Sequence, residues 1–111
     1  MTDLLEQGII FFNAGRYFEA HEVWEDLWRE TGGPLRLFYQ ALVQAAVGMH
    51  HLSRGNRNGA TAQLTKSLDK LRQYPAAFCR IDNARLVADM EAALRELKPC
   101  TISILRVSVT Q

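Results

Sequence analysis

Residues 18–28 read Phe18-Glu19-Ala20-His21-Glu22-Val23-Trp24-Glu25-Asp26-Leu27-Trp28 and indicate the fold class of this 111-residue chain. The two tryptophans stand four residues apart, a spacing that brings them to one face of an α-helix. On a helical wheel His21 lies beside this apolar face and Glu25 lies next to His21, whereas the other acidic side chains point outward. The stretch therefore predicts an amphipathic helix with a titratable pair, His21 and Glu25, at the edge of its buried face.

Helical spacing of apolar residues continues along most of the chain. It predicts five helices, at about residues 4–12, 17–30, 34–53, 57–73 and 83–97. Gly15 and Gly55 stand where a helix ends, and Pro34 suits the first turn of the third helix. We therefore predict an all-α domain over residues 1–98, a compact bundle of about five helices, followed by an extended C-terminal tail over residues 99–111.

Two helical hairpins resemble each other when the sequence is displaced by 40 residues. Gly8 then falls on Gly48, and Trp24 falls on Leu64. Small residues let antiparallel helices approach closely, as in tetratricopeptide repeats, although the long period and the two copies argue against a true repeat array. We expect two antiparallel hairpins with tetratricopeptide-like packing and a closing helix.

The tail has a different pattern from the helices. Its segment Cys-Thr-Ile-Ser-Ile-Leu-Arg-Val-Ser-Val, residues 100–109, is rich in β-branched residues and has no helical period. A lone extended segment needs partners for its backbone. Three arrangements remain open: the tail lies along the helices, pairs with a second copy in a homodimer, or is disordered.

Composition argues against several classes of protein. No apolar run approaches the roughly 20 residues that span a bilayer, so no membrane partner is expected. The N-terminus lacks the basic and apolar regions of a secretory signal. Cys79 and Cys100 have no metal-ligand spacing and are interpreted as ordinary thiols in a reducing cytoplasm. The net charge is +1, and no aromatic residue that could stack on bases interrupts the basic residues from Arg54 to Arg72, which argues against nucleic acid.

A polar pocket is predicted between the second and third helices. The third helix is mostly apolar, but four of its side chains form a narrow polar stripe that is expected to be partly buried. The natural partners of this stripe are the polar side chains at the edge of the second helix. Together they form the predicted ligand pocket, whose residues are His21, Glu22, Glu25, Arg36, Gln40, Gln44 and His51.

Three interpretations of this cluster remain open. It is a structural hydrogen-bond network that joins the hairpins, or a site for a divalent metal ion bound by His21, by Glu22 or Glu25, and by His51. Alternatively, it is a metal-free catalytic site in which Glu25 orients His21 as a general base, as in a hydrolase. His50 is expected to point away from the polar stripe, as a structural or exposed residue.

Several runs of this sequence carry a resemblance to a known family. They are residues 12–25, Trp28-Arg29, residues 38–46, residues 51–56 and Gly59-Ala60. Over about residues 5–75 the chain resembles the prokaryotic family catalogued as domain of unknown function 309. The resemblance implies a compact helical bundle and supplies no activity. The family's characteristic positions would correspond to Gly15, Tyr17, Glu19, Ala20, His21, Glu22, Trp28, Gln40, Gln44, His51, Gly55, Asn56, Gly59 and Ala60.

The sequence thus predicts a small cytoplasmic protein whose polar pocket binds a small ligand, an ion or a protein partner. The first alternative is a metal-dependent or His/Glu acid–base enzyme. The second is a protein–protein interaction module, which an exposed patch containing Phe18, Phe38 or Tyr39 would favour.

Overall fold

Five helices and one short β-hairpin make up the computed structural model, which describes residues 3–107. The helices are α1 (Leu4–Asn13), α2 (Tyr17–Glu30), α3 (Pro34–Ser53), α4 (Arg57–Leu71) and α5 (Asn83–Glu96). The hairpin joins β1 (Ala77–Phe78) to β2 (Ile81–Asp82) between α4 and α5. The all-α prediction is confirmed. The sequence did not predict the hairpin, and α4 ends two residues earlier than expected.

Local interactions of polar side chains and glycines set where the helices begin and end. The Asp3 carboxylate accepts a hydrogen bond from the Leu5 amide at 2.9 Å and caps α1. Gly15 and Gly55 have φ values of 76° and 75°, which let the chain reverse after α1 and α3. These tight reversals produce the antiparallel hairpins.

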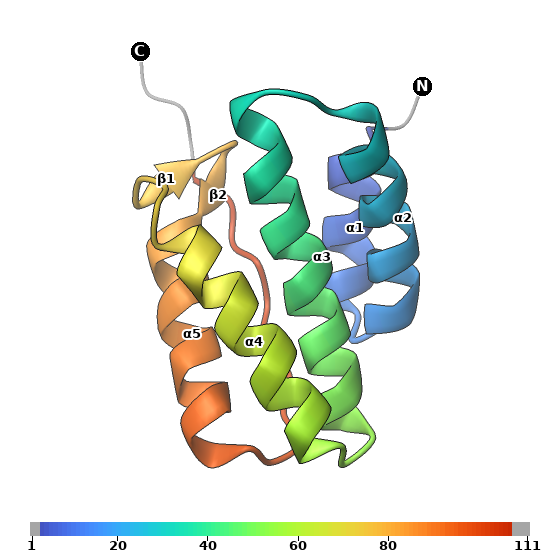
Figure 1. Cartoon of the computed structure of the whole chain (residues 1–111), viewed down its shortest axis with the longest axis vertical. Coiled ribbons are helices and arrows are strands. Elements are labelled where there is room, and N and C mark those ends of the chain that lie inside the picture. Colours follow the sequence, from blue (N-terminus) through green and yellow to red (C-terminus); the bar gives the residue numbers. More distant parts are fainter. Residues whose placement is uncertain (1–2, 108–111) are drawn as a thin grey trace.

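The helix α3 lies at the centre of the bundle, between α2 and α4 (Figure 1). The helix α1 packs on α2, and α5 packs on α4. A methyl group at Gly8 would overlap the Trp24 ring, and one at Gly48 would lie 2.6 Å from Leu64 Cδ2. The two pairs that the displacement by 40 residues aligned therefore make the same close helix–helix approach, which confirms the tetratricopeptide-like packing.

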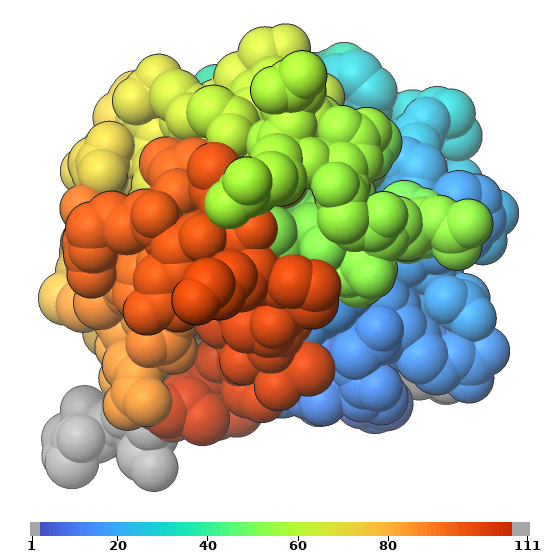
Figure 2. Space-filling view, turned by 90° about the horizontal axis from the view of Figure 1, so that it is seen from below, coloured from blue at the N-terminus to red at the C-terminus, as the bar shows by residue number. Residues whose placement is uncertain are grey.

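The tail runs back from the end of α5 to the β-hairpin, along the helices (Figure 1). Figure 2 shows the C-terminal segment, in red, between α5 in orange and the blue end of the molecule. Ile104 from this segment is buried in the core with 1% of its surface exposed. Of the three arrangements left open by the sequence, the first describes residues 100–107; residues 108–111 lie outside the described part.

No helix within residues 3–107 is long and apolar enough to cross a membrane. Cys79 and Cys100 are free and half-buried. Burial raises the pKa of both thiols, so they remain protonated and weakly reactive at neutral pH.

Candidate functional site

His21 and Glu25 form a contact on α2, one helical turn apart. His21 Nε2 lies 2.8 Å from Glu25 Oε2, and the other carboxylate oxygen of Glu25 accepts a hydrogen bond from Arg29. With the proton on Nε2, the Nδ1 atom of a neutral His21 is the basic nitrogen. This Nδ1 is buried and has no hydrogen-bond partner. The nitrogen that a general base would use is therefore closed to solvent.

A cavity of about 220 Å³ lies between α2 and α3 at the end where α3 finishes. Two aromatic rings of α2 and three side chains of α3 line it: Phe18, His21, Val47, His50 and His51. The Phe18 ring centre lies 5.8 Å from that of His21 and 5.5 Å from that of His50. We call this space the histidine cavity.

His50 lies in a different place from the one predicted from the sequence. It lines the histidine cavity instead of pointing away from the site. Residues three apart share a helix face, so His50 follows Val47 towards α2, just as His21 follows Phe18 towards α3. The paired spacing Phe18-x-x-His21 and Val47-x-x-His50 was the sequence signal for this cavity.

His51 reaches the same cavity but is fixed by the turn into α4. Its Nδ1 atom lies 3.2 Å from Asn56 Nδ2. Asn56 also caps α4, because its Oδ1 atom accepts a hydrogen bond from the Gly59 amide at 3.0 Å. A Cβ atom at Gly59 would lie 2.8 Å from His51 Cγ, so glycine is the residue that leaves room for the imidazole.

The histidine cavity disfavours a positive charge on His50. Burial, followed by the nearby charge of Arg54, lowers the pKa of His50 below its ordinary value of 6.5. Half of the surface of the Phe18 side chain is exposed, at 50%, although Phe18 belongs to the most strongly apolar residue types. The cavity therefore presents imidazole rings, a valine side chain and an accessible phenyl group.

Two further hollows continue from the histidine cavity along α2. The first has a volume of about 240 Å³ and is lined by Phe18, His21, Glu22, Glu25, Asp26 and Arg29. The second, of about 220 Å³, lies between α2 and α3 and is lined by Glu25, Trp28, Gln40, Val43 and Gln44. Each hollow shares at least one residue with the next. We call the three hollows together the α2 groove; from Gln40 to His51 it extends roughly 16 Å along α3.

The structure distributes the predicted pocket residues along this groove instead of gathering them at one point. His21 and His51 meet in the histidine cavity, whereas Gln40 and Gln44 line the hollow at the other end. The Oε1 atom of Gln44 is buried without a partner. Arg36 lines none of the three hollows; its guanidinium lies over the Trp28 ring, 4.4 Å from the ring centre, and donates to the Thr31 carbonyl.

The predicted interaction residues differ in their exposure. Phe18 is exposed, Tyr39 is half-buried and Phe38 is completely buried. Phe38 packs edge-on against Tyr74 and Phe78, with ring centres 5.1 and 4.9 Å away. Phe38 therefore does not contribute to an exposed patch, because the unpredicted β-hairpin covers its ring.

The predicted metal ligands His21, Glu22, Glu25 and His51 do not form a common coordination centre. Within residues 3–107 no group of three or more histidine, cysteine or acidic side chains is arranged to hold a metal ion. Glu25 is engaged by His21 and Arg29, and His51 faces Asn56.

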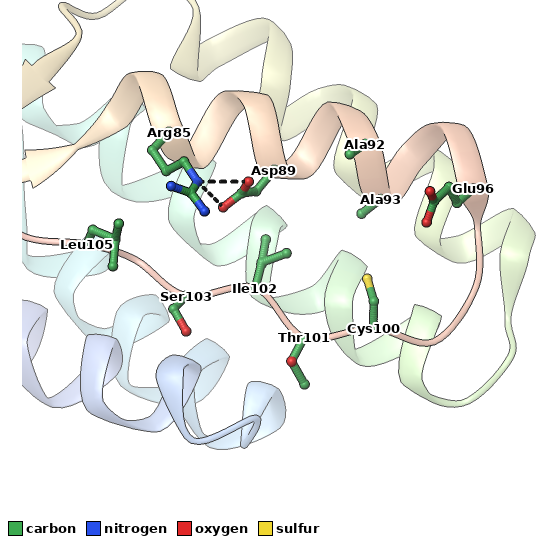
Figure 3. Close-up of a pocket in the computed structure, with 10 residues that line it drawn as sticks. All are labelled: Arg85, Asp89, Ala92, Ala93, Glu96, Cys100, Thr101, Ile102, Ser103 and Leu105. Atoms are coloured by element: carbon green, nitrogen blue, oxygen red, sulfur yellow. Dashed lines mark hydrogen bonds and ion pairs between the residues drawn. The ribbon is translucent and has the colours of Figure 1, made fainter.

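One further cavity of the structure is lined by none of the predicted residues. It has a volume of about 400 Å³ and lies between α5 and the tail (Figure 3). Its lining comes from Arg85, Asp89, Ala92, Ala93 and Glu96 of α5 and from Cys100, Thr101, Ile102, Ser103 and Leu105 of the tail. No motif in the sequence indicated this cavity, since it depends on where the tail docks.

Comparison with known families matches residues 5–63 to a family described as "Domain of unknown function (DUF309)". An uncharacterized protein of Aquifex aeolicus (strain VF5) is 25% identical over 94 residues, covering 84% of this chain and 28% of that protein. The uncharacterized protein YpuF of Bacillus subtilis (strain 168) is 29% identical over 94 residues, covering 81% of this chain and 54% of YpuF. The chain thus spans about a quarter and about half of the lengths of these two relatives.

Proposed function

This chain belongs to the DUF309 family, and we propose that its α2 groove binds a segment of a partner protein. In this proposal an apolar side chain of the partner inserts beside Phe18 in the histidine cavity. The observation that carries the proposal is the half-exposed Phe18 ring at the mouth of a cavity walled by three imidazoles and Val47. Aromatic residues exposed in this way are typical of protein interfaces.

The size of the cavity favours a single side chain as its occupant. Pockets for drug-sized ligands usually enclose about 300–1,000 Å³, and the histidine cavity encloses about 220 Å³. Interfaces between proteins, by contrast, often depend on one anchor residue that fills a small pocket. The two neighbouring hollows, of similar size, would receive adjacent side chains of the same segment.

The charges around the groove suit a partner segment with polar residues beside its anchor. Glu22 and Asp26 are exposed along the outer hollow, and Arg29 lies among them. Exposed charges of this kind contribute to orientation and association rate more than to affinity. The same geometry disfavours general-base catalysis, because His21 Nδ1 is buried and Glu25 already binds Arg29.

Selection of peptides from a displayed random library tests the proposal without a known partner. The selected peptides are expected to share an apolar or aromatic anchor. The Phe18→Ala variant should bind them at least tenfold more weakly, because loss of a central interface contact costs about 2 kcal/mol or more and a tenfold change in affinity corresponds to about 1.4 kcal/mol.

Ile10 supplies the matched control. It is an exposed apolar residue of α1, with 59% of its surface accessible, and it does not line the groove. Ile10→Ala should retain wild-type affinity for the selected peptides. Failure to select any binder, or equal binding to Phe18→Ala and wild type, would refute the assignment of this groove.

A further inference from the structure

The tail is attached to the helix α1 through its backbone. Asn13, the last residue of α1, forms hydrogen bonds through its side chain with both the backbone amide and the backbone carbonyl of Ile104. The Ile104 amide donates to Asn13 Oδ1 at 2.7 Å, and Asn13 Nδ2 donates to the Ile104 carbonyl at 3.0 Å. Arg106 of the tail pairs with Glu6, two turns earlier on α1. The side chains and backbone of residues 104–106 are therefore recognised by a helix from the opposite end of the chain.

The β-hairpin provides the second attachment. The Asp82 amide donates to the Leu105 carbonyl at 2.8 Å, and the Val107 amide donates to the Arg80 carbonyl at 3.0 Å. An antiparallel bridge joins Ile81 to Arg106. With the buried Ile104 side chain, these contacts form a specific docking site for an extended segment.

The tail packs less closely against its own helix α5. The cavity of about 400 Å³ separates α5 from residues 100–105. In Figure 3, Cys100 and Ile102 point from the tail towards α5, whereas Thr101 and Ser103 point to the other side. On α5 the small side chains of Ala92 and Ala93 leave the space unfilled. Thus the hydrogen bonds of residues 100–107 go to α1 and the hairpin, and none within the described part of the chain goes to α5.

This covalent link is a short connector with an unfavourable backbone conformation. Leu97 ends α5 with φ 51° and ψ 36°, a left-handed conformation that side-chain-bearing residues disfavour. Lys98 and Pro99 follow, and both are exposed. Short connectors under strain favour exchange of the connected segment between copies, because an extended connector relieves the strain.

We propose that two copies of this chain exchange their tails, so that residues 100–107 of each copy dock on α1 and the β-hairpin of the other. The occupant is a second copy because its identical tail makes the same Asn13, Glu6 and Arg80 contacts that the structure shows within one chain. Only the connector changes conformation. The exchange leaves the α2 groove untouched and is independent of the function proposed for it.

The connector length decides between the closed and the exchanged form. Light scattering after size exclusion should show wild-type protein shifting from 12.6 kDa towards twice that mass as its concentration rises to the millimolar range. A flexible Gly-Ser insertion between Lys98 and Pro99 should return the protein to the monomer mass. Deletion of Lys98 and Pro99 should give a dimer at every concentration, because the shortened tail cannot reach its own docking site.

Cross-linking distinguishes tail exchange from a dimer formed by other surfaces. The side chains of Glu6 and Arg106 are in contact, so exchange places residue 106 of one copy beside residue 6 of the other. A Glu6→Cys variant mixed at millimolar concentration with an Arg106→Cys variant, both with serine at positions 79 and 100, should therefore form a disulfide-linked heterodimer under oxidation, whereas a mixture that forms none would overturn the proposal. A wild-type protein that stays monomeric at millimolar concentration, or a dimer unaffected by the connector insertion, would overturn the proposal even if the deletion variant does not fold.

Discussion

Replacement of Gly8 by alanine tests the close helix approach on which the first hairpin depends. Gly8 is buried against Trp24, which is itself completely buried. A methyl group at residue 8 would overlap the indole ring, whose Nε1 atom donates to the Leu5 carbonyl at 3.2 Å. The indole must therefore move away from α1 or the two helices must separate.

The expected change in unfolding free energy combines three effects. Alanine is favoured over glycine inside a helix by about 1 kcal/mol. Overpacking of a core costs about 1–3 kcal/mol, and loss of the Trp24–Leu5 hydrogen bond costs about 1 kcal/mol more. We expect Gly8→Ala to lose about 2 kcal/mol in total, which corresponds to a fall in Tm of about 8 °C for a domain of this size.

Urea unfolding followed by circular dichroism measures this change. Gly32→Ala is the matched control, because no atom lies within 4 Å of the added methyl group and Gly32 has no positive φ. Its stability should stay within about 0.5 kcal/mol of wild type. A Gly8→Ala variant as stable as wild type, or more stable, would refute the close packing of α1 on α2.

Three further predictions concern single residues. Asn13→Ala removes both hydrogen bonds to Ile104 and should lower the free energy of unfolding, measured in urea, by about 1–2 kcal/mol. A change near zero would show that these two hydrogen bonds contribute nothing to stability. Gly59→Ala should cost about 1–2 kcal/mol and shift the NMR signals of His51, because its Cβ atom would displace the imidazole; unchanged signals would contradict the contact. Because the pKa of His50 is lowered in the folded protein, the unfolded chain takes up a proton first as the pH falls below about 6.5. The free energy of unfolding should therefore decrease below this pH. His50→Gln should remove this part of the pH dependence.

The helices and their packing could be predicted because they depend on local patterns. Gly8 lies against Trp24, and Gly48 lies against Leu64. Both residues of the first pair stand 40 positions before those of the second pair, so the sequence alone aligns the two pairs. Such small-to-large pairing follows directly from the periodicity of amphipathic helices. It is the reason why the hairpin architecture was predicted correctly.

The β-hairpin could not be predicted because its turn lacks the usual residues. Cys79 and Arg80 both have positive φ values, 51° and 61°, at positions where asparagine and glycine are typical. Tertiary contacts with the tail and with Phe38 hold this turn in place. Without the hairpin, the burial of Phe38 could not be anticipated either.

The positions of the polar side chains between α2 and α3 were predicted in part. His21, Glu25, Gln40, Gln44 and His51 line the α2 groove, as a polar stripe facing α2 would require. The sequence could not show that the groove divides into separate hollows. This division depends on the conformations with which long side chains fill the space between two helices. For the same reason the position of Arg36 over Trp28 was not predictable.

In the proposed function the histidine cavity receives an apolar side chain of a partner. NMR of the three histidine Cε1–H groups measures this directly during titration with N-acetyl-phenylalanine amide, a model for the proposed anchor. We predict saturable shifts of the His21, His50 and His51 signals in wild type and in Ile10→Ala, and much smaller shifts in Phe18→Ala. Signals of all three histidines that remain unchanged up to the solubility limit of the probe would contradict the claim.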